Sequence, residues 1–179
     1  MSERLTKAES RIMMTWACSL RGTCDRLHTA TTLWSPEPEN LLLSGGYNGA
    51  PAGHPSCDEV GHFIQDNHCI RTNHGEENAI LNCHNFAKLS GGTATVLGTP
   101  CYPCARKLVS RNIGRVEYIG SYSNAQGKEY IDELFKNGNV ECIIIPIERL
   151  VETLDKSIKF SKKLNGGVLR SFLDLKLVL

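Results

Sequence analysis

Two short segments of this chain, His74-Gly75-Glu76 and Pro100-Cys101-Tyr102-Pro103-Cys104, restrict its fold more than any other feature. A Cys-x-x-Cys pair whose second Cys lies about one turn into a helix can bind a tetrahedral zinc ion, and a His at the start of another helix completes a three-ligand set. Because His74, Cys101 and Cys104 must then contact one ion, the fold has to bring two helix starts together. Three protein ligands leave the fourth position open for water, which is the catalytic arrangement.

Glu76 supplies a carboxylate beside this set that is not needed as a ligand. Zinc lowers the pKa of its bound water to about 7, so hydroxide is available at neutral pH. Glu76 can reach that water and move its proton, so we expect it to be the catalytic residue. A lone Cys-x-x-Cys could instead be a redox pair or half of a structural zinc site. The proline before each cysteine and the upstream His-x-Glu favour the catalytic zinc.

The chain has 179 residues, which is enough for one domain with a substantial core. Its 20 Lys and Arg residues nearly balance its 19 Asp and Glu residues, which argues against a nucleic-acid groove and favours a small-molecule substrate. No apolar run approaches the roughly 20 residues of a membrane span. The polar N-terminus is not expected to be a signal peptide. Eight cysteines without such a signal indicate metal sites and buried thiols in a reducing compartment, so we expect a cytoplasmic protein.

Helical and strand patterns alternate along the chain. A capping box at Thr6-Lys7-Ala8-Glu9 predicts the start of the first helix. Strands are predicted at residues 29–34, 41–47, 93–99, 115–120 and 140–145, the first two as a hairpin and the last buried on both faces. Further helices are predicted at residues 75–89, around Cys104 up to Gly114, at 130–135, and from about 147 to 164. This order predicts a three-layer α/β/α fold with a mixed five-stranded sheet.

The sequence resembles the cytidine deaminase superfamily, and within it the deoxycytidylate (dCMP) deaminases. The matching segments are Gly45-Gly46-Tyr47-Asn48-Gly49-Ala50-Pro51-Ala52-Gly53, His74-Gly75-Glu76-Glu77-Asn78-Ala79-Ile80, Pro100-Cys101-Tyr102-Pro103-Cys104-Ala105, Ile113-Gly114-Arg115-Val116-Glu117-Tyr118 and Tyr122. The two zinc segments are typical of the superfamily as a whole. The Gly-Tyr-Asn-Gly-x-Pro-x-Gly loop narrows the resemblance to the deoxycytidylate enzymes. The match covers roughly residues 10 to 145.

This resemblance implies a cytidine-deaminase-like fold and zinc-dependent hydrolytic deamination of dCMP to dUMP, with release of ammonia, for pyrimidine deoxynucleotide and dTMP synthesis. It implies a homo-oligomer, and in regulated members dCTP and dTTP as effectors, although this chain has His84 and Asn85 near the position of the regulatory basic residue. We expect residues 1–165 to form the deaminase domain. Residues 166–179 would be a C-terminal extension that packs on a partner chain or on its own domain.

By resemblance, Asn48 hydrogen-bonds the sugar of the substrate, Tyr122 packs beside the base and sugar, and Thr99 and Pro100 belong to the same binding site. Asn48 and Tyr122 each have a simpler interpretation, because an Asn after a strand also favours a turn and a Tyr at a strand end is often half-buried. Arg26, Arg71 and Lys128 are candidates for binding the 5′-phosphate, and the sequence does not choose among them.

Residues 48–73 have no clear periodicity but contain several potential metal ligands. By resemblance to some bacterial and phage members, a second, structural zinc would be bound by Cys24, Cys57, His62 and His68, with Cys69 as a substitute. A closed four-ligand site would stabilise a long segment that lacks its own core. Alternatively, these are scattered polar residues of a loop. Cys18, Cys83 and Cys142 are expected to be small buried apolar side chains.

The chain departs from the family pattern in two places. Gly75 stands where the family usually has Ala, which is expected to open space beside the base, and residues 27–31 replace the usual Val-Gly-Ala. Both changes are compatible with a dCMP that carries a bulkier C5 substituent. The sequence also leaves open a deaminase for a different nucleobase or nucleoside, including adenine in tRNA, a catalytically silent nucleotide-binding regulator, and a zinc-stabilised interaction module.

Overall fold

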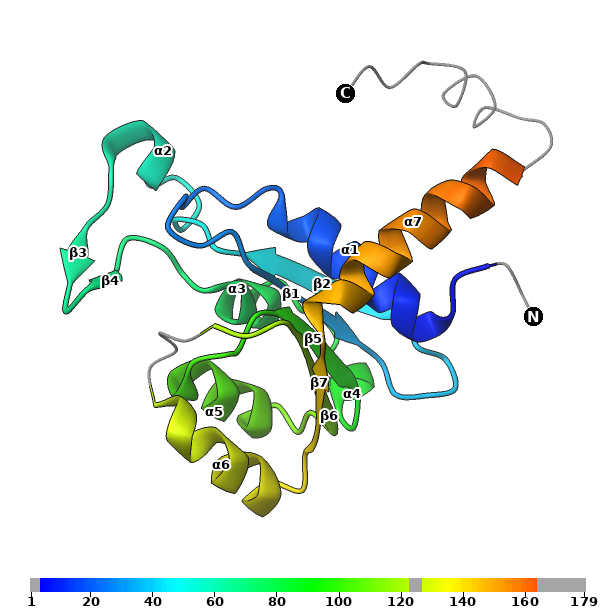
Figure 1. The fold of residues 1–179 in the computed structure, drawn as a ribbon. Coiled ribbons are helices and arrows are strands. Elements are labelled where there is room, and N and C mark those ends of the chain that lie inside the picture. Colours follow the sequence, from blue (N-terminus) through cyan, green and yellow to red (C-terminus); the bar gives the residue numbers. More distant parts are fainter. Residues whose placement is uncertain (1–3, 123–126, 164–179) are drawn as a thin grey trace.

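The computed structural model describes residues 4–122 and 127–163, and a mixed five-stranded sheet runs through its centre in the order β2-β1-β5-β6-β7 (Figure 1). The strands are β1 (Ala30–Trp34), β2 (Leu42–Tyr47), β5 (Thr93–Leu97), β6 (Arg115–Ile119) and β7 (Glu141–Ile145). The pairs β1–β2 and β1–β5 are antiparallel, whereas β5–β6 and β6–β7 are parallel. The predicted hairpin and the predicted mixed sheet are therefore both present.

Helices cover both faces of the sheet. On one face α1 (Lys7–Ser19) and α7 (Ile147–Lys163) pack together, around a small apolar cluster of Ile12, Ile119 and Leu150. On the other face lie α3 (Gly75–Leu81), α5 (Tyr102–Ser110) and α6 (Ile131–Asn137), over a larger cluster that includes Leu33, Leu108 and Phe135. The three-layer α/β/α fold expected from the sequence is confirmed.

The first helix begins at the predicted capping box. The Thr6 hydroxyl accepts a hydrogen bond from the Glu9 N–H at 3.2 Å, and the Glu9 carboxylate accepts one from the Thr6 N–H at 2.8 Å. These two bonds satisfy backbone donors that have no partner within the helix. The capping box thus fixes where α1 leaves the preceding chain.

The helix predicted at residues 75–89 is interrupted. α3 ends at Leu81, and a separate short helix, α4 (Phe86–Leu89), follows. The side chain of Asn85 accepts a hydrogen bond from the Lys88 N–H at 3.1 Å and caps α4. Asn side chains compete with the helix for backbone hydrogen bonds, which explains why the polar stretch between α3 and α4 separates them.

Strand β7 corrects the expectation of a strand buried on both faces. It lies at the end of the sheet, and Ile144 is 65% exposed while Cys142 is also exposed. An apolar run is typical of a buried parallel strand, but its place in the strand order decides how much of it is covered. Of the three cysteines expected in the core, Cys83 is buried and Cys18 is half-buried.

Residues 48–73 leave the sheet as a long excursion, with a short helix α2 (Cys57–Val60) and two short paired strands, β3 (Ile64–Gln65) and β4 (His68–Cys69). α2, β3 and β4 project away from the sheet at one end of the molecule (Figure 1). Within residues 4–122 and 127–163, no helix is both long enough and apolar enough to cross a bilayer. The expected C-terminal extension, residues 166–179, lies outside the described residues.

Candidate active site

Two helix starts carry the ligands expected for a catalytic zinc. His74 is the N-cap residue of α3, Cys101 is the N-cap residue of α5, and Cys104 lies in the first turn of α5. The Nδ1 atom of His74 lies 3.5 Å from the sulfur of Cys101 and 3.5 Å from that of Cys104. Zinc–sulfur and zinc–nitrogen bonds of usual length at tetrahedral angles separate such atoms by about 3.6 Å. These three residues, called the inner ligand set below, therefore have the spacing and chemistry that suit zinc.

The inner ligand set also has favourable electrostatics for a cation. The Cys104 thiol and the His74 ring hydrogen-bond to the Cys101 sulfur and lower its pKa to about 4, so one thiolate is present at neutral pH. The same contact with Cys101 raises the pKa of Cys104. A metal ion binds thiolates and neutral imidazole, so its binding would displace the remaining protons.

Glu76 follows this set in the first turn of α3 and is 4% exposed. Its carboxyl does not belong to the inner ligand set, so it is available for a role other than holding the metal. Burial raises the pKa of the Glu76 carboxyl. A carboxyl whose pKa moves toward neutrality can both accept and return a proton, which suits a general acid–base residue.

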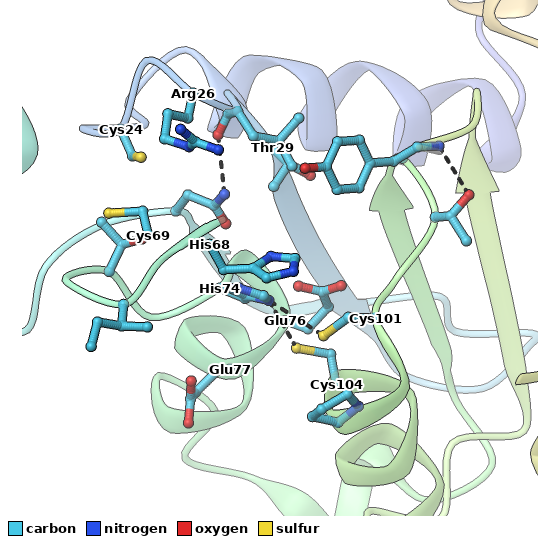
Figure 2. Close-up of a pocket in the computed structure, with 18 of the residues that line it drawn as sticks. Cys24, Arg26, Thr29, His68, Cys69, His74, Glu76, Glu77, Cys101 and Cys104 are labelled. Atoms are coloured by element: carbon cyan, nitrogen blue, oxygen red, sulfur yellow. Dashed lines mark hydrogen bonds between the residues drawn. The ribbon is translucent and has the colours of Figure 1, made fainter. Parts of the chain in front are cut away.

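The inner ligand set and Glu76 open into a cavity of about 320 Å³ (Figure 2). Asn48, Thr99 and Tyr122, the residues expected to contact the substrate, line this cavity, and the Thr99 hydroxyl accepts a hydrogen bond from the Tyr122 N–H at 3.1 Å. Pro100 is buried and is not among the described residues that line the cavity. The structure thus gathers three of the four expected substrate contacts around one cavity.

The cavity wall also includes residues that the sequence did not single out. These are Leu97, Glu77 and Lys107, among others, whereas Leu27 and Thr29 of the lining belong to the segment that departs from the family pattern. Lys107 donates to the Glu77 carboxylate at 2.6 Å and so joins α5 to α3 at the cavity wall. Its signal in the sequence is its position, one turn after Cys104 on the same helix. His28, which belongs to the departing segment 27–31, is exposed and is not among the described residues that line the cavity, so it is a surface residue.

The space expected beside Gly75 does not exist. A Cβ atom at this position would lie 3.0 Å from the Cα of Ala30 and 3.2 Å from the carbonyl oxygen of Gly46. Gly75 therefore allows α3 to pack directly on the backbones of β1 and β2, and the expectation that it enlarges the substrate site is wrong. The cause is tertiary contact, which a comparison of single residues does not reveal.

A second group of potential metal ligands lies where the excursion meets the turn before β1. Its ligand atoms, from Cys24, Cys57, His62 and Cys69, all lie within 4.8 Å of one another. The Cys57 and Cys69 sulfurs are 3.6 Å apart, and the Cys24 sulfur is 3.7 Å from Nδ1 of His62. These separations suit a tetrahedral zinc site with four protein ligands. We call these four residues the outer cluster.

The outer cluster contains Cys69, the expected substitute, in place of His68. Consecutive side chains of a strand point to opposite faces, so His68 and Cys69 of β4 face different surroundings. Both residues line part of the cavity, but only the Cys69 sulfur also lies among the other three ligand atoms of the outer cluster (Figure 2). Burial opposes ionisation of Cys69, but backbone N–H groups of Arg71 and Phe63 hydrogen-bond to its sulfur and lower its pKa to about 6. Cys69 is therefore well suited to bind a cation at neutral pH.

Asp25 holds the His62 ring in the orientation that a metal ligand needs. The Nε2 atom of His62 lies 2.9 Å from the Asp25 carboxylate, which leaves Nδ1 directed toward the sulfurs. Histidine ligands of metals usually donate their other ring N–H to such a carboxylate. The sequence analysis did not identify Asp25, although its position directly after Cys24 could have suggested that it supports a metal ligand.

The structure separates the three candidates for binding a phosphate. Arg26 lines the cavity, and its guanidinium donates to the backbone oxygen of Asn67 at 2.9 Å. Arg71 donates to the backbone oxygen of Gly61 at 2.9 Å and is not in the described lining. The side chain of Lys128 lies outside the described part of the chain. Among the described residues, Arg26 is therefore the candidate at the cavity.

A three-layer α/β/α fold with a His-x-Glu and a Cys-x-x-Cys at two adjoining helix starts defines a zinc-dependent hydrolytic deaminase. The sequence profile described as the cytidine and deoxycytidylate deaminase zinc-binding region matches residues 11–119, and the chain belongs to this family. Membership of the cytidine deaminase superfamily, expected from the sequence, is confirmed.

Relatives with similar sequences include a bacterial and two phage proteins. ComE operon protein 2 of Bacillus subtilis (strain 168) is 30% identical over 160 residues, which cover 89% of this chain and 82% of that protein. Deoxycytidylate deaminase of Enterobacteria phage T2 is 25% identical over 149 residues, covering 62% of this chain and 78% of that protein. Deoxycytidylate deaminase of Mycobacterium phage D29 is 28% identical over 114 residues, covering 57% and 85%.

Similar solved structures show the same fold. The dCMP deaminase of cyanophage S-TIM5, in complex with dCMP and dUMP, superposes with a TM-score of 0.61 at 19% identity, covering 77% of this chain and 96% of that chain. Acinetobacter baumannii RibD superposes with a TM-score of 0.56 at 20% identity, covering 93% of this chain and 40% of that chain. At these identities the likeness concerns the fold alone. The substrate has to be argued from the site.

Proposed function

We propose that this protein deaminates dCMP to dUMP with release of ammonia. The observation that carries the proposal is the buried Glu76 carboxyl beside the inner ligand set, in a cavity whose wall also includes Arg26. Two phage relatives are named deoxycytidylate deaminases, and the cyanophage structure contains dCMP and dUMP. Pyrimidine deoxynucleotide supply for dTMP synthesis is the metabolic role that this reaction would serve.

The reaction replaces the amino group at C4 of cytosine with oxygen from water. Zinc held by His74, Cys101 and Cys104 would lower the pKa of a water at its open position. Glu76 would accept one proton of that water on its carboxylate and deliver it to N3 of the base, while the water oxygen forms a bond to C4. Glu76 would then take the second proton from the hydroxyl on C4 and pass it to the amino group, so that the C4–N bond breaks, ammonia leaves and C4 keeps the oxygen. The raised pKa of the Glu76 carboxyl suits this alternation between acid and base.

Asn48, Thr99 and Tyr122 would hold the base and the sugar. Each polar atom of the Asn48 side-chain amide makes one protein hydrogen bond and keeps further capacity that a sugar hydroxyl could use. Tyr122 presents its ring from the segment after β6, beside Thr99. Pro100, which lies outside the described lining, would act by fixing the start of α5 rather than by touching the substrate.

The 5′-phosphate would bind to Arg26, with His68 as a second candidate on the cavity wall. Of the described residues that line the cavity, Arg26 and Lys107 have permanently cationic side chains, and Lys107 is paired with Glu77. Arg26 uses one amino group of its guanidinium on Asn67 and keeps other donors for an anion. Arginine binds phosphate through two parallel hydrogen bonds when its fork is free to face it.

The outer cluster would hold a second, structural zinc. We therefore expect two zinc ions per chain in fully loaded protein, and a content of one would remove the outer site from the proposal. Packing at Gly75 removes one reason to expect a bulkier C5 substituent, so unmodified dCMP is the preferred substrate. A cytoplasmic homo-oligomer remains an expectation from the resemblance, in which dCTP and dTTP are the effectors of the regulated members.

The deciding experiment measures ammonia release from dCMP by zinc-loaded protein and by its Glu76→Gln variant. Glu76→Gln should keep the fold and the zinc content, and its turnover number should fall by about 10²- to 10⁴-fold. Glu133→Gln, the same change on the exposed face of α6, is the matched control and should retain activity. Turnover retained by Glu76→Gln would refute the role of this residue. Wild-type protein that binds dCMP without turning it over would favour the silent regulator instead.

A further inference from the structure

We infer that the outer cluster sets the preference of the cavity for a phosphorylated substrate, because it holds the two chain segments that carry Arg26 and His68. This inference rests on the proposed function. It assigns the outer cluster a role in substrate selection in addition to stabilisation of the fold.

The excursion has little apolar packing to hold it in place. From residue 51 to residue 67 nearly every described side chain is exposed, and Cys57 is the buried exception. Its large apolar side chains are exposed as well, including Val60, Phe63 and Ile64. A segment that buries so little surface needs another source of order. Four ligands that converge within 4.8 Å provide one, since metal binding contributes directly to folding free energy.

The outer cluster also forms part of the cavity wall. Cys24 and Cys69 line the cavity, together with Arg26 and His68. Figure 2 shows Cys24, Cys69 and Arg26 on one side of the cavity and the inner ligand set with Glu76 on the other. Arg26 and the groups for the chemistry thus lie on two sides of the cavity that are built by different parts of the fold.

Arg26 and His68, the two proposed phosphate-binding residues, each lie close in the chain to a ligand of the outer cluster. Arg26 comes two residues after Cys24, and His68 comes directly before Cys69. Asp25, between Cys24 and Arg26, lies 2.9 Å from Nε2 of His62. The backbone at Arg26 is therefore held at the outer cluster in two ways. Cys24 is one of its ligands, and Asp25 contacts its ligand His62.

Hydrogen bonds join the segment that carries Arg26 directly to the segment that carries His68. The Arg26 guanidinium donates to the backbone oxygen of Asn67 at 2.9 Å and to its side-chain oxygen at 3.4 Å. Asn67 lies two residues before Cys69. When the outer cluster holds its metal, Arg26 and His68 are presented together. Without it, the excursion can move and the two side chains lose their common position.

The inner wall does not depend on this arrangement. His74 and Glu76 belong to α3, and Cys101 and Cys104 to α5, which pack on the sheet over the larger apolar cluster. Loss of the outer metal should therefore weaken binding of the phosphate and leave binding of the base and sugar nearly unchanged. Loss of charge-assisted phosphate contacts corresponds to roughly a 10- to 100-fold loss of affinity.

Cys57→Ser tests the inference, because Cys57 belongs to the outer cluster but is not in the described cavity lining. Cys142→Ser, the same change at an exposed residue of β7, is the matched control. For each full-length protein, zinc content is measured by atomic spectroscopy, and the dissociation constants of dUMP and deoxyuridine are measured by calorimetry. Circular dichroism and thermal unfolding show that the variants are folded.

We expect Cys57→Ser to lose one zinc per chain and to lower the ratio of dUMP affinity to deoxyuridine affinity by roughly 10- to 100-fold. Its deoxyuridine affinity should stay within about two-fold of wild type, as for a phosphate-specific effect. Because the outer cluster acts through Arg26, combining Cys57→Ser with Arg26→Gln should lower the ratio by less than the product of the two single losses. An unchanged ratio after loss of the outer zinc, or additive losses in the double variant, would overturn the inference.

A second variant is used if Cys57→Ser does not fold. Asp25→Ala keeps all four ligands of the outer cluster, and it should also lower the ratio of dUMP affinity to deoxyuridine affinity. An unchanged ratio in Asp25→Ala overturns the inference. If the wild-type protein binds dUMP more tightly than deoxyuridine and the variants keep the same affinity ratio, this inference alone is contradicted. Wild-type protein that does not bind dUMP contradicts the proposed function itself, and with it the inference.

Discussion

The side-chain amide of Asn48 joins the start of the ligand helix to the chain before β1: its Oδ1 accepts a hydrogen bond from the Gly75 N–H at 2.8 Å. Its Nδ2 donates to the carbonyl oxygen of Leu27 at 3.0 Å. Gly75 lies between His74 and Glu76, so Asn48 controls the backbone that carries both. Its place beside the substrate and its structural role are therefore compatible.

Asn48→Ala should destabilise the zinc-loaded protein markedly. It leaves the Gly75 N–H and the Leu27 carbonyl without their partner, at about 1–3 kcal/mol for each buried group. Asn48→Asp keeps an acceptor for Gly75 but sets a carboxylate oxygen against the Leu27 carbonyl oxygen, so it should recover only part of this loss. Urea unfolding of both variants measures the effect. A loss below about 0.5 kcal/mol in Asn48→Ala would contradict the structural role.

Substitution of three glycines by alanine should destabilise the protein in a fixed order. A Cβ at Gly46 would lie 2.1 Å from the backbone nitrogen of Ala79, one at Gly75 would lie 3.0 Å from the Cα of Ala30, and one at Gly45 would lie 3.4 Å from the sulfur of Cys18. Backbone atoms cannot move aside as a side chain can. We expect Gly46→Ala to be the most damaging, Gly75→Ala to lose about 1–3 kcal/mol, and Gly45→Ala to be nearly neutral. Thermal unfolding gives the ranking, and a neutral Gly75→Ala would restore the expectation of free space.

Glu9 makes the stability of the fold depend on pH. Burial opposes its ionisation, but hydrogen bonds from Lys156 and Thr6 outweigh burial and hold the pKa of the Glu9 carboxyl below its usual range. Because the pKa is lower in the folded chain, ionised Glu9 stabilises the fold above the usual pKa of a carboxyl, and this stabilisation is lost as the pH falls.

Glu9→Gln should therefore lower the free energy of unfolding by about 1–2 kcal/mol at pH 7, and the difference from wild type should shrink below roughly pH 5. Glu152→Gln removes an exposed partner of Arg149 and should change stability by less than about 0.5 kcal/mol at either pH. Urea unfolding at several pH values measures both. A Glu9→Gln effect that grows toward acid pH would show that the sign is wrong.

The buried ion pair of Arg11 and Glu117 ties α1 to β6. The Arg11 Nε atom donates to Glu117 at 2.9 Å, and both side chains are 4% exposed. Arg11→Met leaves a buried carboxylate without its partner and should lower the free energy of unfolding by about 3–5 kcal/mol. Arg11→Met/Glu117→Leu removes both charges and should recover a large part of that loss. A double variant less stable than Arg11→Met would contradict this account.

Several elements were predictable because their signals are local. The capping box at Thr6, the hairpin of β1 and β2 and the helix starts at His74 and Cys101 each depend on a few neighbouring residues. Elements whose state depends on distant neighbours were harder to predict. The apolar run of β7 says nothing about its place at the edge of the sheet, and only that place leaves Ile144 exposed.

The sequence by itself determined the inner ligand set and its carboxylate, since the spacing within each segment allows little choice about which atoms can meet one ion. Only the tertiary structure decided that Cys69 rather than His68 joins the outer cluster, because alternation along β4 sends these neighbours to opposite faces. It also brought Arg26 to the cavity and closed the space at Gly75. Both outcomes depend on contacts between segments far apart in the chain, and the chemistry of the residues alone does not specify such contacts.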